Sequence, residues 1–234
     1  VLEDCSFTIN RGQTVGLVGE NGSGKSTIAK LILRLYDVNE GRILLNGVDI
    51  REYDIDRYRA LFSALFQDFV KYSFTMRENI ALSDYSQLGN DEKILDAAEK
   101  SEVSEFARDW KNGIDTPLTR DFEDDGKELS GGQWQRIALA RVFFADRSFI
   151  LLDEPSASLD VFAEEKIFNQ FANLSLERTS VIISHRLSSI VSADKIIVLK
   201  GGAIIEEGSH KELLGSGGYY AGLFELQASR YYST

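Results

Sequence analysis

One stretch of the sequence decides the fold: Gly19-Glu20-Asn21-Gly22-Ser23-Gly24-Lys25-Ser26. It matches the pattern G-x-x-x-x-G-K-[ST], in which glycines let the backbone curl until successive N–H groups point at phosphate oxygens. A short apolar run at 14–18 precedes the stretch, and a segment with helical periodicity at 25–35 follows it. A phosphate-binding loop needs a strand before it and a helix N-terminus after it. The order therefore predicts an α/β fold that binds ATP at this loop.

The side chains of the loop have separate expected roles. Lys25 is expected to reach the outer phosphates as a point charge, and the Ser26 hydroxyl is expected to coordinate Mg²⁺. The predicted ATP-binding residues are Gly19, Asn21, Gly22, Ser23, Gly24, Lys25, Ser26 and Thr27.

A second chemical signal is a predicted buried strand that ends in two carboxylates. Residues 149–152 are apolar and lead directly to Asp153 and Glu154. Ligands bind in doubly wound sheets at the crevice where the carboxyl ends of the strands meet. We expect Asp153 to hold Mg²⁺ and Glu154 to act as a general base or to orient the attacking water. The phosphate loop in the same chain disfavours the alternative, in which two acidic residues end a strand and only face water.

The order of predicted elements indicates the domain organisation. Alternating strands and helices imply right-handed crossovers and a parallel sheet covered on both faces. Residues 68–127 differ, because they show helical periodicity from 91 to 110 and almost no strand-like runs, so we expect a helical insertion there. Predicted strands span 2–10, 14–18, 42–45, 61–66, 148–152, 179–183, 195–199 and 203–207, and predicted helices span 25–35, 131–146, 161–175, 187–191, 210–214 and 219–229.

Composition argues against several classes of protein. The chain has 234 residues and is 43% hydrophobic, which suits one large domain or one domain with an insertion. A net charge of −11 argues against nucleic acid as the main partner, because phosphate neutralisation needs clustered Lys and Arg. Cys5 is the only cysteine, so an internal disulfide is excluded, and we expect its thiol to pack as a small apolar group. No apolar run approaches membrane-spanning length.

A second anion site is predicted at Leu129-Ser130-Gly131-Gly132-Gln133, where the helix before the acidic strand begins. Ser130 is expected to cap this helix, and the glycines allow close approach to its N-terminus. Here the sequence resembles the ATP-binding cassette family, whose signature motif reads LSGGQ. The resemblance covers essentially the whole chain.

Further motifs resemble those of the family in the expected order. Gln67 is similar to the glutamine that joins the catalytic core to the helical subdomain and touches Mg²⁺ and the attacking water. Ser158-Leu159-Asp160 resembles the D-loop, and His185 resembles the switch histidine that contacts the γ-phosphate. A histidine after a strand is more often structural when taken alone, but this order of motifs favours the functional interpretation. His210 starts a predicted helix, and we expect it to be a capping or surface residue.

The resemblance implies both fold and partners. It implies a P-loop ATPase core with a mainly parallel sheet and an antiparallel β subdomain (1–67 and 128–234), and a helical subdomain (68–127), with the signature at 129–133. Two such domains pack head to tail, with ATP between the phosphate loop of one and the signature of the other. Ser130, Gly131, Gly132 and Gln133 would then act in trans, in an identical or a different partner domain. Lys25, His185 and Mg²⁺ would stabilise phosphate charge while Glu154 polarises water.

Within the family, residues 66–80 and 208–227 resemble exporter-type cassettes. In exporters a membrane domain precedes the cassette in the same polypeptide, and the cassette lies at the cytoplasmic face of the cell membrane. The start at Val1, without Met, is what a piece of such a polypeptide would show. The alternatives are an importer-type cassette, or a soluble cassette ATPase acting on nucleic acid or ribosomes. The soluble class usually has long coiled-coil insertions or tandem cassettes, and neither occurs here.

Two features depart from the family pattern. The aromatic residue that stacks on adenine normally lies upstream of the point where this sequence begins, which predicts weakened ATP affinity. An acidic run at 121–128 stands where exporters usually carry a Gly-Glu-Arg-Gly-like run. This run has two open interpretations: a contact with the coupling helices of a membrane domain, or a solvated loop.

Overall fold

The computed structural model describes residues 1–175 and 178–232. The chain divides into two compact units. The first unit comprises Val1–Phe62, Arg147–Glu154 and Ser175–Thr234, and the second comprises Ser63–Asp146 and Pro155–Leu174. No helix in the described part of the chain combines the length and apolar character that crossing a membrane requires.

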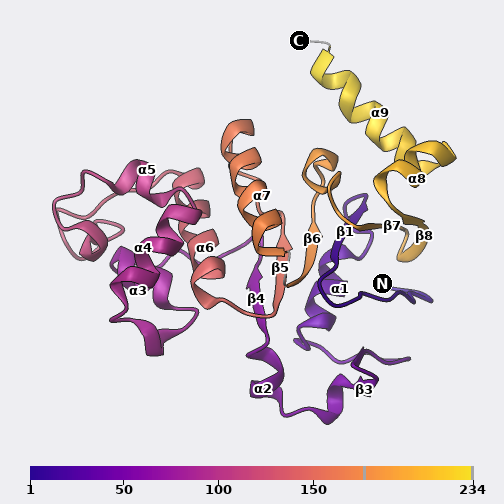
Figure 1. The fold of residues 1–234 in the computed structure, drawn as a ribbon, viewed down its shortest axis with the longest axis horizontal. Helices are drawn as coiled ribbons and strands as arrows, with labels where there is room; N and C mark the ends of the chain where they lie inside the picture. The colour runs from indigo at the N-terminus through magenta and orange to yellow at the C-terminus, as the bar shows by residue number, and fades with distance from the viewer. Residues whose placement is uncertain (176–177, 233–234) are drawn as a thin grey trace. The chain divides into compact units, whose positions relative to one another are not determined.

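The first unit is built on a mainly parallel sheet, whose strands lie in the order β5-β6-β1-β7-β8 (Figure 1). The bounds are β1 (Thr14–Gly19), β5 (Phe149–Asp153), β6 (Thr179–Ile183), β7 (Lys195–Lys200) and β8 (Ala203–Gly208). β1 pairs in parallel with both neighbours, so that Leu17 aligns with Ile183 and with Ile197. Leu17 and Val18 are both buried, which shows that both faces of this strand are covered.

A separate antiparallel pair of strands, β2 (Leu44–Leu45) and β3 (Val48–Asp49), lies in the same unit. Asn46 and Gly47 connect them with φ angles of 52° and 82°, the left-handed geometry of the tight hairpin turn that Asn-Gly favours. The short helices η1 (Ile50–Glu52) and α2 (Ile55–Arg59) follow. A mainly parallel sheet with a separate antiparallel pair confirms the predicted fold class.

In this unit one predicted strand does not form, and one predicted helix is shorter than expected. Residues 2–10 alternate in burial as predicted but form no strand, since Asp4 adopts a left-handed φ of 48° that interrupts extended backbone. Helix α1 (Lys25–Ile32) stops short of the predicted residue 35, because Arg34 adopts a φ of 52° and Leu35 is 44% exposed. The apolar spacing at 35 therefore does not continue the helix.

The last elements of the first unit are η4 (Leu187–Ile190), α8 (His210–Ser216) and α9 (Tyr219–Tyr232). Of the two roles predicted for His210, capping of the helix is wrong. Ser209 caps α8 through the backbone N–H of Glu212. His210 is half-buried, and its Nδ1 lies 2.8 Å from the hydroxyl of Tyr220.

The second unit is made mainly of helices, with α6 (Gly131–Ala145) at its centre. The chain enters it along β4 (Phe62–Leu65), whose first residue still belongs to the first unit. Its other elements are α3 (Met76–Ala81), η2 (Tyr85–Gln87), α4 (Asp91–Lys100), α5 (Val103–Ala107), η3 (Gly113–Asp115) and α7 (Val161–Ser175). Helix α6 packs against α3, α4 and α5, and its Phe143 stacks on Phe171 of α7 at 4.6 Å. The helical periodicity predicted from 91 to 110 is divided at Glu102, which adopts a φ of 60°.

Candidate active site

Strand β1 leads directly into the glycine-rich loop, whose backbone requires glycine. Gly19 and Gly24 adopt φ angles of 148° and 104°. A Cβ on Gly19 would lie 2.1 Å from the carbonyl oxygen of Leu199, so no larger residue fits there. The sequence pattern therefore predicted where the loop lies and why its backbone requires glycine.

The N-terminus of α1 is available to an anion. Gly24 occupies its N-cap position without a side chain that could bind the first N–H groups. The Ser23 hydroxyl is buried and lacks a hydrogen-bond partner among the described residues. A buried donor left without a partner is costly, and a phosphate oxygen would satisfy it. These features fit a nucleotide phosphate, while Asn21 and Ser26 are exposed and Thr27 lies in the first turn of α1.

Lys25 folds back over the loop that it follows. Its Nζ donates to the carbonyl oxygens of Gly19 and Glu20, each at 2.9 Å, and only 8% of the residue is exposed. Burial lowers the pKa of the Lys25 amine, and the nearby carboxylates of Glu154 and Asp153 act in the opposite direction. The Lys25 amine thus lies among carboxylates and carbonyls at the N-terminus of α1.

Glu154 and His185 form a pair at the ends of neighbouring strands. Glu154 follows β5, and its N–H donates to the carbonyl of Ile183, the last residue of β6. Its Oε2 lies 2.5 Å from Nδ1 of His185, whose side chain is 56% exposed while that of Glu154 is 11% exposed. Burial raises the pKa of Glu154, and the neighbouring His185 opposes this rise. A buried carboxylate of raised pKa beside an exposed imidazole is an arrangement suited to moving a proton.

Asp153 is the last residue of β5 and is buried. The predicted residues Lys25, Asp153, Glu154 and His185 are therefore brought together in the first unit. Carboxylate and hydroxyl oxygens are the ligands that Mg²⁺ prefers, and Asp153 and Ser26 supply both types beside the phosphate loop.

The signature residues lie at the N-terminus of α6 in the second unit. Ser130 caps this helix as predicted, since the backbone N–H of Gln133 donates to its hydroxyl at 3.3 Å. The Gln133 side chain accepts from the Ser130 N–H at 2.9 Å and completes a capping box. Ser130 and Gly131 are exposed, so the N-terminus of a 15-residue helix faces solvent in this unit.

The predicted D-loop contacts this helix within the second unit. A Cβ on Gly132 would lie 2.9 Å from the carbonyl oxygen of Ser158, and the N–H of Ser158 donates to Gln135 at 2.7 Å. Asp160 accepts from the N–H groups of Phe162 and Ala163, each at 3.0 Å, and so caps α7. Gln67 is exposed just after β4.

The acidic run at 121–128 is held by contacts within its own loop and with a neighbouring one. Asp121 accepts from the Ser73 hydroxyl at 2.5 Å, and Glu128 accepts from the N–H of Arg120 at 3.0 Å. A Cβ on Gly126 would lie 1.8 Å from the carbonyl of Thr119, so the loop closes tightly there. Phe122 is 85% exposed beside the acidic side chains.

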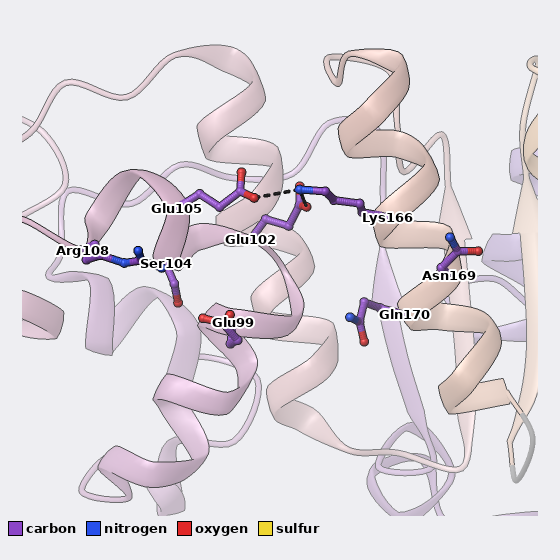
Figure 2. Close-up of a pocket in the computed structure, with 8 residues that line it drawn as sticks. All are labelled: Glu99, Glu102, Ser104, Glu105, Arg108, Lys166, Asn169 and Gln170. Atoms are coloured by element: carbon purple, nitrogen blue, oxygen red, sulfur yellow. Dashed lines mark hydrogen bonds and ion pairs between the residues drawn. The ribbon is translucent and has the colours of Figure 1, made fainter.

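A cavity of about 300 Å³ lies elsewhere in the second unit, and none of its lining residues is a predicted site residue (Figure 2). Its lining residues are Glu99, Glu102, Ser104, Glu105, Arg108, Lys166, Asn169 and Gln170. Figure 2 shows Glu105 and Lys166 pointing toward one another, and their charged groups are 2.9 Å apart. The charged side chains that line the cavity form ion pairs with one another. This is the environment of a structural ion-pair cluster.

Sequence reasoning missed two contacts that α9 makes with the first unit's loops. The Tyr219 hydroxyl donates to Oε1 of Glu20 at 2.5 Å, and the Gln227 side chain bonds to the backbone of His185 and of Leu187. Partners so far apart in sequence leave no periodicity or spacing by which they could be found.

Comparison with known proteins agrees with this geometry. A family model described as ABC transporter matches residues 2–157. The subtilin transport ATP-binding protein of Bacillus subtilis is 43% identical over 213 residues, which cover 91% of this chain and 34% of that protein. The ATP-dependent lipid A-core flippase of Haemophilus ducreyi is 42% identical over 228 residues, which cover 97% of this chain and 38% of that protein.

A solved structure, that of a bacterial Atm1-family ABC exporter with ATP bound, aligns with a TM-score of 0.89 at 36% identity. The alignment covers 97% of this chain and 39% of that one. The chain thus spans 34% to 39% of the length of these relatives. A match over this much of the chain, together with the phosphate loop and the signature, confirms the resemblance on which the predictions rested. The chain belongs to the ABC transporter family, whose matched domain binds ATP.

Proposed function

We propose that this chain is the ATP-hydrolysing domain of an exporter and that its turnover drives transport across a membrane. The observation that carries the proposal is the pairing of Glu154 with His185 beside Lys25 and the phosphate loop. A nucleotide-binding domain that only binds ATP needs no such proton-handling pair. The relatives support the exporter class over an importer or a cassette that acts on nucleic acid or ribosomes, since their names describe a flippase and export proteins.

The phosphate loop would hold the triphosphate through charge and backbone donors. The Lys25 amine would exchange its bonds to the loop carbonyls for phosphate oxygens, and the Ser23 hydroxyl would gain the partner that it lacks. Ser26 and Asp153 of the first unit are proposed to hold Mg²⁺, which neutralises charge on the transferred phosphoryl group when bound. The contact of Gln67 with Mg²⁺ stays what the family resemblance implies.

Glu154 would orient and polarise the attacking water, and His185 would position Glu154 and contact the γ-phosphate. Because its pKa is raised, the Glu154 carboxylate is a stronger base than an ordinary glutamate. It is therefore better suited to take part of a proton from water near neutral pH. His185 approaches Glu154 through Nδ1, so its Nε2 remains for a phosphate oxygen.

A second domain would complete the site. The helix N-terminus at Ser130, Gly131, Gly132 and Gln133 is a second place for anions, and its exposed first residues are accessible to a partner. We propose that a second copy or a close relative supplies this signature in trans to the ATP held by the phosphate loop, with Ser158 and Asp160 of the D-loop beside it. A membrane domain, of the same polypeptide or an associated one, would couple closure of this dimer to transport at the cytoplasmic face of the membrane.

The test is turnover and assembly of the purified chain with ATP and Mg²⁺. Glu154→Gln is expected to keep ATP binding and to lower phosphate release by about 10²–10⁴-fold, the range for loss of a general base. Glu165→Gln, an exposed glutamate of α7, is the matched control and should retain turnover. Unchanged turnover in Glu154→Gln would remove this carboxylate from the mechanism.

Assembly is tested separately by sedimentation. The Glu154→Gln chain is expected to dimerise with ATP, and adding Ser130→Arg should prevent the dimer because the cation and its bulk occupy the helix N-terminus. An ATP-bound chain that stays monomeric at every protein concentration would contradict the composite site.

A further inference from the structure

We propose that Gln227, on α9, is a positioning residue for His185, so that the C-terminal helix sets the geometry of the Glu154–His185 pair. The proposal rests on the proposed function, in which that pair acts on water and phosphate. All of its contacts lie within the first unit.

The side-chain amide of Gln227 bonds to two backbone groups that flank Arg186. Its Nε2 donates to the carbonyl oxygen of His185 at 2.6 Å, and its Oε1 accepts from the N–H of Leu187 at 3.0 Å. One planar amide thus uses both its donor and its acceptor on the same short segment. Such a two-point contact fixes orientation as well as distance, which a single hydrogen bond does not.

The backbone groups of Arg186, which lies between the two that Gln227 bonds, have other partners. The N–H of Arg186 donates to the Ser184 hydroxyl at 3.0 Å, and its carbonyl accepts from the Ser189 hydroxyl at 2.6 Å. Leu187 is only 2% exposed. Without Gln227, the Leu187 N–H would lose its partner where the segment enters the core, which favours a different backbone conformation for residues 185–187.

The helix that carries Gln227 is itself firmly anchored, so it can act as a reference. Both oxygens of Glu206 accept from the first N–H groups of α9, those of Tyr219 at 2.5 Å and Tyr220 at 2.9 Å. Tyr220 is fully buried, and its hydroxyl contacts His210 of α8. The Tyr219 hydroxyl also holds Glu20 of the phosphate loop. Helix α9, the last helix in Figure 1, therefore contacts both the loop that binds phosphate and the loop that carries His185.

The consequence for the reaction follows from the short Glu154–His185 contact. A shift of the His185 backbone moves its ring relative to Oε2 of Glu154, now 2.5 Å away. Catalytic geometry is sensitive to displacements of this kind, whereas ATP affinity depends mainly on the phosphate loop and Lys25. Gln227 should thus affect turnover far more than ATP binding.

The experiment compares Gln227→Leu, Gln227→Glu and the control Glu225→Gln in the 234-residue chain. The Leu variant removes both bonds at similar volume, and the Glu variant removes the donor to His185 while an acceptor for Leu187 stays. Glu225 is exposed on the same helix. We expect kcat to fall about tenfold in both Gln227 variants with KM for ATP changed less than about twofold, as for a misplaced catalytic group. The control should match the parent chain.

A second readout needs no nucleotide. The chain has only two histidines, His185 and His210, so the imidazole signals in a nitrogen–proton NMR spectrum are few and assignable. We expect the His185 signals to shift in both Gln227 variants. The His210 ring packs against Tyr220 and Phe224 of α9, and its signals should not shift. If the signals of both histidines shift in Gln227→Leu, that substitution has displaced the helix. The result for Gln227→Glu then decides whether Gln227 positions His185.

The outcomes separate the two proposals. Unshifted His185 signals in Gln227→Glu, or an equal shift in Glu225→Gln, overturn the role of Gln227 whatever the activity. A drop in kcat/KM that comes from KM alone overturns it as well. If the parent chain hydrolyses no ATP, the proposed function fails, while a selective His185 shift would still establish the positioning contact.

Discussion

Arg141 of α6 is the residue whose removal tests the packing of the second unit most directly. Its guanidinium donates to the carbonyl of Asn79 at 2.9 Å, to Oδ1 of Asn79 at 2.8 Å and to the carbonyl of Val70 at 2.9 Å. It also lies 5.4 Å from the ring centroid of Tyr72. Burial lowers the pKa of Arg141 to about 10, so the group remains charged at neutral pH.

Asn79 extends this network to the segment between Gln67 and α3. It is fully buried, and its Nδ2 donates to the carbonyls of Tyr72, Phe74 and Thr75 at 3.0 to 3.2 Å. Arg141 thus connects the helix that begins with the signature to the loop that follows Gln67. Removing the guanidinium leaves two acceptors of a buried residue without their donor.

The magnitude follows from the exposure of the partners. Hydrogen bonds from a charged donor contribute about 1.5–3 kcal/mol each, and we take the lower end for the two bonds to Asn79. The Val70 residue is 55% exposed, so water can replace the third bond at little cost. The variant Arg141→Met should therefore lose about 3 kcal/mol of unfolding free energy, which lowers a urea midpoint by about 1–3 M at ordinary m-values.

The assay can be made specific to this unit. Both tryptophans of the chain, Trp110 and Trp134, lie in the second unit, so their fluorescence during urea unfolding reports on it. Arg108→Met makes the same chemical change at an exposed position of the same unit and should stay within about 0.5 kcal/mol of the parent chain. A loss below about 1 kcal/mol in Arg141→Met, or one equal to that of Arg108→Met, would refute the reasoning.

Two further predictions use the same fluorescence assay. Gly132→Ala should destabilise the second unit by about 1–3 kcal/mol, because its Cβ would lie 2.9 Å from the Ser158 carbonyl, whereas Gly131→Ala meets nothing closer than 3.9 Å and should be stabilising; a shift of the same sign in both would contradict this. The Lys166 amine holds the pKa of Glu105 below its usual range, so the stability from this pair is present above that range and lost as pH falls through the lowered value. As pH falls, the urea midpoint should therefore decrease more steeply in the parent chain than in Lys166→Met. Equal slopes of midpoint against pH would show that the Glu105–Lys166 pair does not contribute to stability.

The elements that sequence predicted best are those whose ends carry chemistry or sharp turns. Strand β6 (Thr179–Ile183) has the predicted bounds, and the Ser130 cap places the start of α6. The phosphate loop was predictable because its glycines answer a local backbone requirement. Local signals of this kind are complete within a few residues.

What could not be predicted depends on partners far along the chain. The Gln227–His185 and Arg141–Asn79 bonds join residues 42 and 62 positions apart, and a glutamine or arginine within an amphipathic helix has no spacing that names its acceptor. The break at Glu102 was also missed, because apolar periodicity continues across it and only the left-handed φ of 60° reveals it. Domain bounds at 68 and 127 and the roles of the site residues in catalysis stay predictions.

The backbone at Glu154 shows how one strand delivers two carboxylates to one site. In a continuing strand, successive side chains point to opposite faces, so Asp153 and Glu154 would diverge. Glu154 instead adopts a φ of 54°, a left-handed conformation that costs a non-glycine residue about 1–2 kcal/mol. Its N–H bond to Ile183 and its contact with His185 hold it there, and both carboxylates act on the charge of Lys25. The strain at Glu154 is therefore what allows one apolar strand to present two carboxylates to Lys25 of the same phosphate loop.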